Sequence, residues 1–537
     1  MTNSVTVSLR DALVRLRSTN EVRIVWADAL CIAQFDDEEK SSQVRRMDSI
    51  FYRAKRVVVW LGHVDTEHAM GIKRLFESLR CIRGDPEHYD SCWHIPYVAA
   101  TLRDSLPWRA LELFLDSPWF RRMWCIQEIK LASRSLFYWG AEELPRHVAV
   151  RLAGWKMDGH PCAEAPASHI RSSQYAWRMN GPLNQDTCRL LQALGTYRAW
   201  QATYPRDKVY GILGLMELGE ERHILKIDYE ESAQEVYHDV ATAIIRWTGD
   251  LAIFAHVHHS EDYDGDSRYE SWILQWDQSL HVPPSQMGRA LFPLARAHGI
   301  YDRLAPPASI IRSYDRQVIV SGLIYQTVFY TGQPIEESLD VSGRYYPYEA
   351  IDFENYPREI VLEYWRQRIS REPPLGHNLS PEMMFMARTL TTGVVDRAET
   401  LYEHANGEEI AAYSRSFLAY IHLLYLISDN KSGSGSTIGE LSQYGDGWKL
   451  FAYISDKYCF RRKFFRAQNG SFGLGPACLR ENDVIVVLEG AFTPCALRPK
   501  GDNYLLLGQV YIDEIMHGEL IREIEEGKRE RQYFCLN

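Results

Sequence analysis

The chain has 537 residues, more than one hydrophobic core usually organises, so two or more domains are expected. Its formal net charge of -11 argues against broad binding to nucleic acid phosphates, and no partner of that class is expected. The ten cysteines are scattered without a C-x-x-C pair, so neither a metal site nor a disulfide framework is predicted. With no signal-peptide pattern and no apolar stretch long enough to span a bilayer, we expect a cytoplasmic protein without a membrane span.

The first predicted elements are a helix, a strand, a second helix and a second strand. Ser8 stands before apolar residues at helical spacing and caps the first helix in this interpretation. The β-branched run Val22–Trp26 is typical of a buried strand. The acidic stretch Asp36–Glu39 then favours a helix N-terminus, and Val57–Leu61 predicts the second strand. Two strands joined by one helix predict a right-handed βαβ unit in a parallel sheet.

In parallel sheets, ligands bind beyond the carboxyl ends of the strands. Asp28 and the loop that holds Gln34, Asp36 and Asp37 follow the first predicted strand. We therefore expect these four residues to border a substrate cleft.

The helical pattern Trp119–Ala132 places a carboxylate on its apolar stripe. Glu128 lies four residues after Trp124, and both are predicted to face inward. A carboxylate there loses hydration, which raises its pKa unless a cation pairs with it. Two interpretations stay open, a structural ion pair with Arg121 or Arg122 and a functional carboxylate. A further strand is expected at Leu136–Trp139.

A second polar motif begins with Tyr204-Pro-Arg-Asp-Lys-Val-Tyr210 and has the signals of a helix start. Arg206 and Lys208 would either bind an anion or form salt bridges with Glu128 or Asp28.

The remaining patterns predict a helical middle and a β-rich end. Helices are expected at 233–245, 358–369 and 408–427, and strands at 318–329, 483–488, 495–497 and 504–512. The Ser/Gly stretch 432–436 is typical of a flexible loop or linker. His256, His258 and His259 are interpreted as a loop rather than a metal site.

Several motifs together resemble one protein family. They are Trp26-Ala-Asp28-Ala-Leu-Cys-Ile-Ala-Gln34, Val57-Val-Val-Trp-Leu-Gly62, Trp119-Phe-x-Arg-x-Trp124-x-Ile-Gln-Glu128, the Pro-Arg-Asp-Lys-Val-Tyr stretch, and glycine-rich segments after Cys459. Their order resembles the heterokaryon-incompatibility (HET) domain proteins of filamentous fungi, whose HET domain is thought to be distantly related to TIR domains of flavodoxin-like fold.

The resemblance implies a chemistry for Glu128. TIR enzymes that hydrolyse NAD carry a catalytic glutamate in a Trp-Cys-x-x-Glu helix, and Trp124-Cys-Ile-Gln-Glu128 has that spacing. It implies Glu128 as the catalytic residue, with Asp28, Gln34, Asp36, Asp37, Trp124 and Arg206 as substrate-binding residues. NAD would be the substrate, with no separate cofactor.

The chain departs from the family at two places. Met1–Val7 is too short to hold the family's usual first strand, and Ala33 replaces an asparagine. The departures leave lost activity, a truncated gene model or a diverged function open. If Val22–Trp26 is a strand, its open edge needs a cover, and we expect a later strand rather than a second copy of the chain.

The combined reading is an α/β protein with three parts. A flavodoxin-like, TIR-like parallel sheet is predicted for 1–145, a mainly helical region for 146–430 and a small β-rich module for 431–537. The implied function is fungal nonself recognition and regulated cell death through NAD cleavage. Whether the chain binds an unidentified protein partner or forms a homo-oligomer stays open. The alternatives are a catalytically inactive interaction module and a HET-like fold reused in specialised metabolism.

Overall fold

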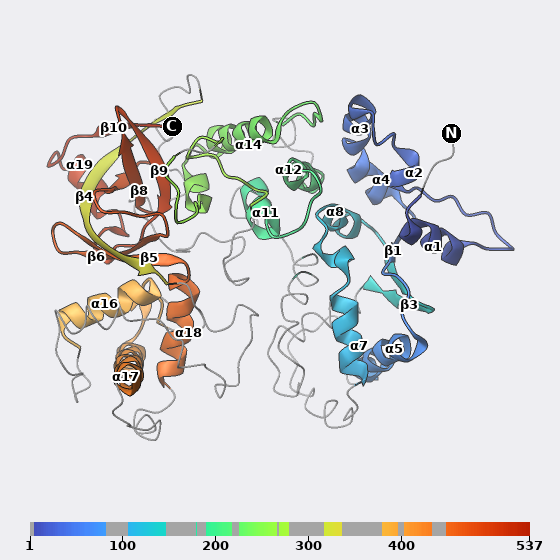
Figure 1. Cartoon of the computed structure of the whole chain (residues 1–537), viewed down its shortest axis with the longest axis horizontal. Helices are drawn as coiled ribbons and strands as arrows, with labels where there is room; N and C mark the ends of the chain where they lie inside the picture. Colours follow the sequence, from blue (N-terminus) through green and yellow to red (C-terminus); the bar gives the residue numbers. More distant parts are fainter. Residues whose placement is uncertain are drawn as a thin grey trace. The chain divides into compact units, whose positions relative to one another are not determined.

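The computed structural model describes residues 5–81, 106–146, 175, 179, 189–216, 225–265, 268–278, 316–335, 379–395, 402–431 and 447–537. These residues belong to two compact units (Figure 1). The first unit holds the described residues up to Val240 together with 276–278, and the second holds the others. The expected helix at 358–369 and the linker at 432–436 lie outside the described residues, and the three-part division stays a prediction.

The first unit begins with short helices whose starts are set by side-chain caps. They are α1 (Val7–Leu16), α2 (Asp28–Cys31), α3 (Asp37–Val44) and α4 (Met47–Arg53). The Thr6 hydroxyl accepts a hydrogen bond from the backbone N–H of Leu9, so Thr6 caps α1 and the predicted cap, Ser8, lies inside the helix. Asp36 caps α3 by accepting from the N–H of Glu39, which confirms the helix start that the acidic run predicts.

The sheet of the first unit has the order β1-β2-β3, with β1 (Val57–Trp60), β2 (Ser135–Trp139) and β3 (Glu142–Pro145). Strands β1 and β2 are parallel, and β3 is antiparallel to β2. The chain between β1 and β2 includes α5 (Thr66–Cys81), α7 (Leu106–Leu115), the 3₁₀ turn η2 (Pro118–Arg121) and α8 (Trp124–Lys130). A parallel pairing with a helical crossover is therefore present, and both strand predictions are confirmed.

The predicted first strand is wrong. Residues 22–27 form no strand, and the side chains of Val22 and Ile24 are 96% and 98% exposed. No described strand covers this segment, so the expected βαβ unit from Val22 to Leu61 is not formed, and a flavodoxin-like sheet stays a prediction. A β-branched run becomes a strand only where a neighbour accepts and donates its backbone hydrogen bonds, and none of the described strands does so here.

Aromatic side chains form the core beside this sheet. The Phe114 ring lies 5.5 Å from that of Trp139 and 5.6 Å from that of Phe120, and Phe120 stacks on Phe137 at 5.9 Å. These rings join α7 and η2 to β2. The Phe114–Trp139 contact is edge-to-face, Phe114–Phe120 is tilted and Phe120–Phe137 is stacked, and ring pairs add to the stabilisation from buried apolar area. The segment before α8 is fixed to the sheet in this way.

Three further helices are α11 (Arg189–Tyr197), α12 (Asp207–Leu213) and α14 (Ala233–Thr248). The predictions of a helix beginning at the Pro-Arg-Asp-Lys motif and of another from Ala233 are confirmed.

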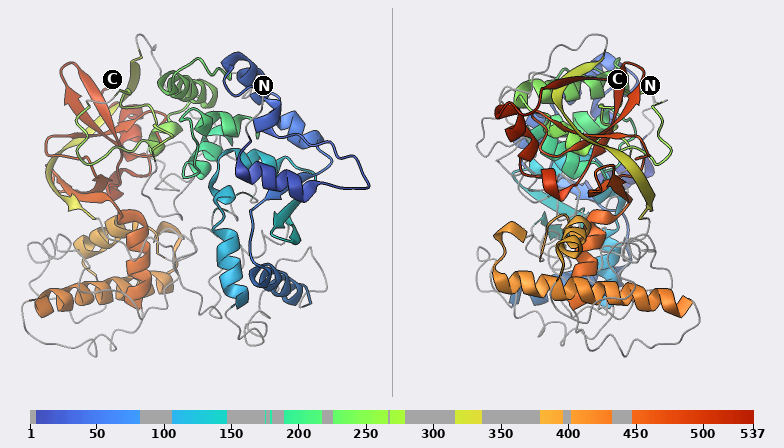
Figure 2. Two further views of the ribbon diagram at one scale, coloured as in Figure 1. Left: turned by 45° about the vertical axis from the view of Figure 1, so that its right-hand side comes forward. Right: turned by 90° about the vertical axis from the view of Figure 1, so that its left-hand side faces the viewer.

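The second unit is built on a closed sheet. Its strands are β4 (Val318–Pro334), β5 (Arg462–Ala467), β6 (Phe472–Pro476), β7 (Val484–Leu488), β8 (Cys495–Lys500), β9 (Asn503–Gln509) and β10 (Gln532–Leu536). The order is β10-β9-β8-β7-β4-β5-β6, and β10 also pairs with β4, which closes the ring (Figures 1 and 2). Within the ring of β4, β7, β8, β9 and β10, each strand has a neighbour on both sides, whereas β5 and β6 extend the sheet from β4. The strands predicted after residue 431 are confirmed, and β4 joins them from far earlier in the chain.

Helices accompany the closed sheet. They are η4 (Ala252–His256), α16 (Pro381–Thr391), η7 (Tyr402–His404), α17 (Gly407–Lys431), α18 (Gly447–Cys459), η9 (Asp513–Ile515) and α19 (Glu519–Glu525). Helices α16, α17 and α18 share one apolar core that includes Phe417 and Phe451, and the long α17 is clear in the right-hand view of Figure 2. None of the described helices is long and apolar enough to cross a membrane.

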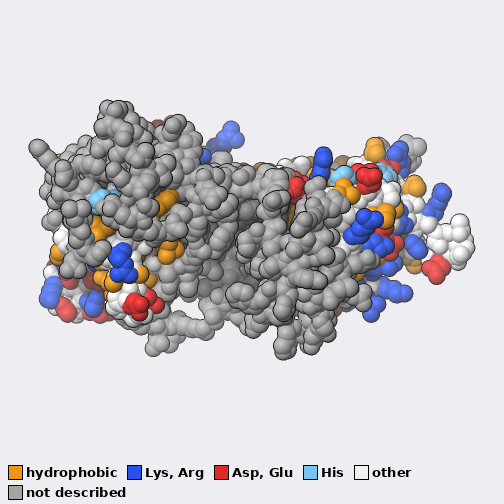
Figure 3. Space-filling model, turned by 90° about the horizontal axis from the view of Figure 1, so that it is seen from below, with side chains coloured by type: hydrophobic (Ala, Val, Ile, Leu, Met, Phe, Trp, Pro, Cys, Tyr) orange, Lys and Arg blue, Asp and Glu red, His pale blue; other side chains and the backbone are white. Residues whose placement is uncertain are grey.

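Charge is mixed over the surface. On the face drawn in Figure 3, basic and acidic side chains are interspersed among the described residues.

His259, one of three closely spaced histidines, stacks on Tyr263 at 3.8 Å and lies 2.9 Å from the carbonyl oxygen of Leu506. No group of three His, Cys, Asp or Glu side chains among the described residues could hold a metal ion.

A buried ion pair fixes a loop to the closed sheet. The Arg498 guanidinium donates to both carboxylate oxygens of Asp483 at 2.9 Å and to the carbonyls of Tyr263 and Cys478. The Asp483 side chain is 3% exposed. Removing the guanidinium would leave Asp483 Oδ2 with only the backbone N–H of Arg480 as a donor, and among the described residues the Asp483 carboxylate would have no cation beside it.

We predict that Arg498→Met lowers the free energy of unfolding by about 3 to 5 kcal/mol, because it leaves the Asp483 charge buried and unpaired. Arg522→Met is the control, since Arg522 and its partner Glu519 are both exposed and such a pair contributes less than about 1 kcal/mol. Chemical denaturation followed by circular dichroism measures both. Equal loss of stability in the two variants would contradict the assignment.

Candidate functional site

The segment before Glu128 is broken into two short helices rather than one long helix. Helix η2 ends at Arg121, the backbone of Arg122 is extended, and α8 begins at Trp124. Gln201 causes the break, because its carbonyl accepts from the N–H of Met123 at 2.8 Å and its N–H donates to the carbonyl of Arg121. The prediction of one helix over Trp119–Ala132 is therefore corrected by a contact from far along the chain.

Glycines bring α12 close to α8. A Cβ on Gly211 would lie 2.7 Å from Cγ of Met123, and a Cβ on Gly214 would lie 2.5 Å from Oε1 of Gln127. A side chain at either position would have to displace Met123 or the Gln127 amide, so the two glycines leave room for α12 to lie close to α8. The Gln127 amide also donates to the carbonyl of Tyr210 at 3.2 Å, and α8 is held in place.

Glu128 lies in α8 among four side chains that act on its carboxylate. The Trp119 indole N–H donates to Oε2 at 3.4 Å, and the Cys125 thiol, one turn earlier, also donates to the carboxylate. Burial raises the pKa of Glu128, and the nearby Asp28 carboxylate raises it further. The Arg122 guanidinium and the two hydrogen bonds act in the opposite direction but do not cancel the rise.

A fixed ion pair does not hold Glu128 among the described residues. Arg121, one expected partner, forms its ion pair with Asp116 at 3.0 Å. Arg122, the second expected partner, attracts Glu128 electrostatically but forms no ion-pair contact with it. The charges of Glu128 and Asp28 both raise the pKa of Arg122. The structure brings Asp28, Arg122 and Glu128 into one neighbourhood although about a hundred residues separate the first from the last.

The predicted cleft residues around Asp28 have local roles. Asp28 starts α2, and the Gln34 amide donates to its backbone carbonyl at 3.2 Å. Asp36 caps α3, and the carbonyl of Asp37 accepts from the hydroxyl of Ser41 at 2.6 Å. Of the four residues, Asp28 is the one whose charge raises the pKa of Glu128.

Trp124 belongs to a second group of side chains, centred on a buried carboxylate. Its indole N–H donates to Oδ2 of Asp207 at 3.1 Å, and the Tyr229 hydroxyl donates to Oδ1 at 2.6 Å. Burial raises the pKa of Asp207, while these two hydrogen bonds lower it. Asp207 therefore links α8 to the segment before α14.

The other motif residues have partners of their own. Arg206 donates to the carbonyl of Glu231, and Lys208 donates to the carbonyls of Arg198 and Trp200. Burial lowers the pKa of Lys208 to about 8. The expected salt bridges of Arg206 and Lys208 with Glu128 or Asp28 are not among the contacts that the structure describes.

Sequence reasoning missed Lys40, which lies in α3 and is 8% exposed. Its ammonium lies 4.2 Å from the ring centre of Tyr204 and 4.0 Å from that of Tyr229. A signal was present, because Lys40 falls four residues before Val44 on the buried face of α3. The roles of Asp207 and Tyr229 carried no such signal.

A family model described as "Heterokaryon incompatibility protein (HET)" matches residues 1–128, and one described as "Het-6 beta-barrel domain" matches residues 446–536. By these two matches the chain resembles heterokaryon-incompatibility proteins. It is 23% identical to "Heterokaryon incompatibility protein 6, OR allele" of Neurospora crassa, over 92% of this chain and 81% of that protein. No solved structure matches it.

The boundaries of the two matched regions do not coincide with the structural units of the chain. The HET match ends at Glu128, yet α8 is completed by contacts with Gln201 and Asp207 beyond that end. The barrel match begins at residue 446, yet β4 from earlier in the chain pairs with β5, β7 and β10. Both units therefore need residues outside the matched regions.

The raised pKa of Glu128 predicts a pH-dependent stability difference. A group whose pKa rises on folding stabilises the protein below its unfolded pKa, and this contribution is lost as the pH rises through the folded value. Glu128→Gln should thus gain thermal stability relative to the natural chain as the pH rises from below about 4.5. Thermal unfolding across pH 4 to 8 measures this, with Glu67→Gln, at an exposed residue of α5, as the control. A Glu128→Gln variant that loses relative stability with rising pH would contradict the assignment.

Proposed function

We propose that this protein acts in fungal nonself recognition and regulated cell death by cleaving the nicotinamide–ribose bond of NAD. The printed name of the Neurospora relative supports the first part. The Trp124-Cys-Ile-Gln-Glu128 spacing supports the second, because it is similar to that of NAD-hydrolysing TIR enzymes. The observation that carries the proposal is the Glu128 carboxylate, which is desolvated, near Asp28, and without a fixed ion pair among the described residues.

The proposed reaction needs a carboxylate of this kind. As the glycosidic bond breaks, its electron pair goes to the nicotinamide nitrogen, and positive charge develops at C1′ of the ribose. An ionised Glu128 stabilises that charge more strongly in a desolvated site than in water. Water then adds to C1′ and releases a proton, which gives ADP-ribose and neutral nicotinamide.

The neighbours of Glu128 have proposed roles in the same reaction. The Trp119 N–H orients the carboxylate through its hydrogen bond. Asp28, as a second negative charge, adds to the field that favours a cationic ribose. Since the ionised form is the active one, the rate should rise with pH through the raised pKa of Glu128.

We predict that Glu128→Gln lowers nicotinamide release from NAD by at least about 100-fold, because the neutral amide cannot balance the charge on the ribose. The melting temperature at neutral pH should not fall. Chromatographic assay of nicotinamide measures the rate, and Glu67→Gln should retain full activity.

A natural chain without turnover, together with a Glu128→Gln variant that unfolds several degrees earlier, would contradict the proposal. That result would assign Glu128 to a structural pairing with Arg122.

The exposed residues 22–25 favour a second candidate function, a protein-interaction module. Val22 and Ile24 are apolar and almost fully exposed, and no described strand pairs with them. Such a segment can add to the strand edge of a partner, including a second copy of the chain. Catalysis is not needed for this function.

If this segment joins two copies, Ile24→Asp should convert a dimer into a monomer, because a carboxylate cannot be buried unpaired in the contact. Sedimentation velocity at several concentrations measures the change. Phe329→Asp, at a residue that is also exposed, is the control and should leave the dimer intact. A natural chain that stays monomeric at all concentrations would exclude self-association through this segment.

A further inference from the structure

Lys40 is a buried cation without an acceptor in the described part of the chain. Its side chain in α3 is 8% exposed, and its ammonium lies over the rings of Tyr204 and Tyr229 at 4.2 and 4.0 Å. Nζ donates no hydrogen bond to a described residue, and it is not one of the fully buried polar atoms of the chain. The ring faces attract the ammonium without accepting its hydrogen bonds in the way an oxygen would, so its donors stay open to solvent or to a ligand.

The nearest carboxylate is already occupied. Asp207 attracts Lys40, but its two oxygens accept hydrogen bonds from Tyr229 and Trp124. Both donors are neutral, so they satisfy the oxygens without adding charge. Asp207 balances Lys40 only through space.

A second cation lies over the same two rings. The Arg206 guanidinium is 5.2 Å from the ring centre of Tyr229 and 5.8 Å from that of Tyr204. Its Nη1 donates to the carbonyl of Glu231, whereas its buried Nε has no partner. Arg206 and Lys40 also repel one another, and burial and this repulsion lower the pKa of Lys40. Two cations with unused donors therefore share one carboxylate.

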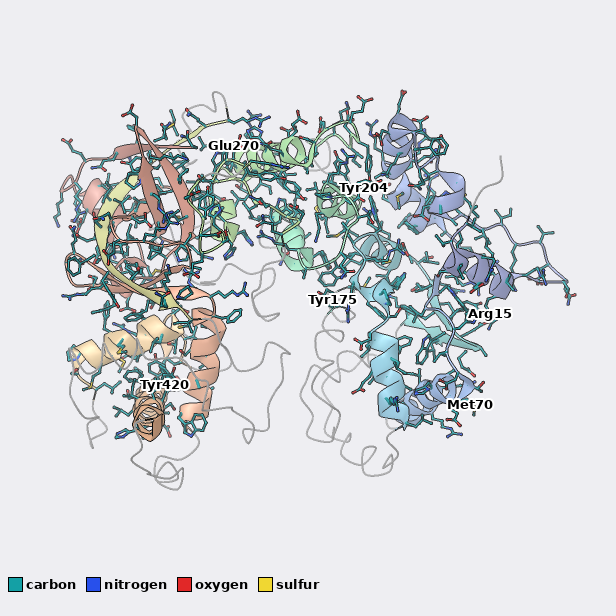
Figure 4. All side chains as sticks on the ribbon, viewed as in Figure 1. Arg15, Met70, Tyr175, Tyr204, Glu270 and Tyr420 are labelled. Carbon is teal, nitrogen blue, oxygen red and sulfur yellow. The ribbon has the colours of Figure 1, made fainter. Side chains whose placement is uncertain are left out.

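An exposed aromatic ring lies at this place. Tyr204 is 47% exposed, whereas Tyr229 is buried. Figure 4 shows Tyr204 beside the ribbons of α3 and α12, in agreement with its contact to Lys40. A ligand that reaches the two cations would touch this ring, which suits the sugar or base of a nucleotide.

We propose that Lys40 and Arg206, together with Tyr204, form a binding subsite for the diphosphate of a nucleotide ligand. A diphosphate supplies the negative charge and the acceptors that both cations lack, and Arg is well suited to phosphate oxygens. A cation–π contact alone would explain how α3 is held, but it would leave the Nε of Arg206 and the ammonium of Lys40 without acceptors.

The subsite deepens the proposed function, on which its choice of a dinucleotide rests. Trp124 donates a hydrogen bond to Asp207 and lies in α8, four residues before Glu128. Four residues correspond to about one helical turn, or about 6 Å along the helix axis. NAD bound by its diphosphate at Lys40 and Arg206 would thus have its ribose within reach of Glu128. Binding of a diphosphate does not itself require Glu128.

The test is isothermal titration of the full chain with ADP-ribose, inorganic pyrophosphate and AMP. We expect ADP-ribose to bind more tightly than pyrophosphate, and AMP to bind most weakly, since it lacks the second phosphate. Lys40→Met should weaken ADP-ribose binding at least tenfold, and Lys55→Met, at an exposed lysine of the same unit, should leave it unchanged. Pyrophosphate that binds as tightly as ADP-ribose would assign the subsite to free diphosphate and would overturn the nucleotide part.

Two further variants separate binding from folding and from catalysis. Lys40→Arg keeps the charge and should retain binding, and Arg206→Gln should weaken it even if Lys40→Met does not fold. Glu128→Gln should still bind ADP-ribose through the diphosphate, so loss of turnover there leaves the subsite standing. Absence of ADP-ribose and pyrophosphate binding at millimolar concentration, or equal binding by the natural chain and Arg206→Gln, would overturn the subsite whatever the activity shows.

Discussion

The Asp207 carboxylate is the contact on which the first unit depends most. It is buried, and each of its oxygens accepts a hydrogen bond from a neutral side chain, Trp124 or Tyr229. These bonds offset the cost of burying the charge and join α8 to a segment about a hundred residues later. Because Trp124 opens α8 and Glu128 lies one turn further, the same bonds set the position of Glu128.

Electrostatics divides this region into two parts of opposite sign. Around Glu128, burial and Asp28 work against ionisation, and Arg122 only partly compensates. Around Asp207, the cations Lys40 and Arg206 outnumber the carboxylate. Trp124 belongs to both parts, because it lies in the same helix as Glu128 and its indole N–H donates to Asp207. A ligand whose ribose becomes cationic during the reaction and whose diphosphate is anionic would match the charge of both parts. This match is the physical link between the two proposals.

Local patterns predicted a large share of the fold, and nonlocal contacts decided the rest. The Asp36 cap, strand β1 and helix α14 follow from short-range spacing and were predicted. The break before α8 depends on Gln201, and the closure of the sheet depends on β4, so neither has a short-range signal. At the site, the burial of Glu128 was predictable from its helical stripe, whereas the neighbours of Lys40 were not.

The central claim is that Glu128 is a desolvated carboxylate rather than one half of an ion pair. The most direct measurement is an NMR titration of the glutamate side chains labelled with ¹³C at Cδ, with the Glu128 signal assigned by its absence in Glu128→Gln. We expect a pKa above the ordinary glutamate value, because burial and Asp28 outweigh Arg122. A pKa below that value would show that Arg122 neutralises the carboxylate, and Glu128 would then be one half of an ion pair.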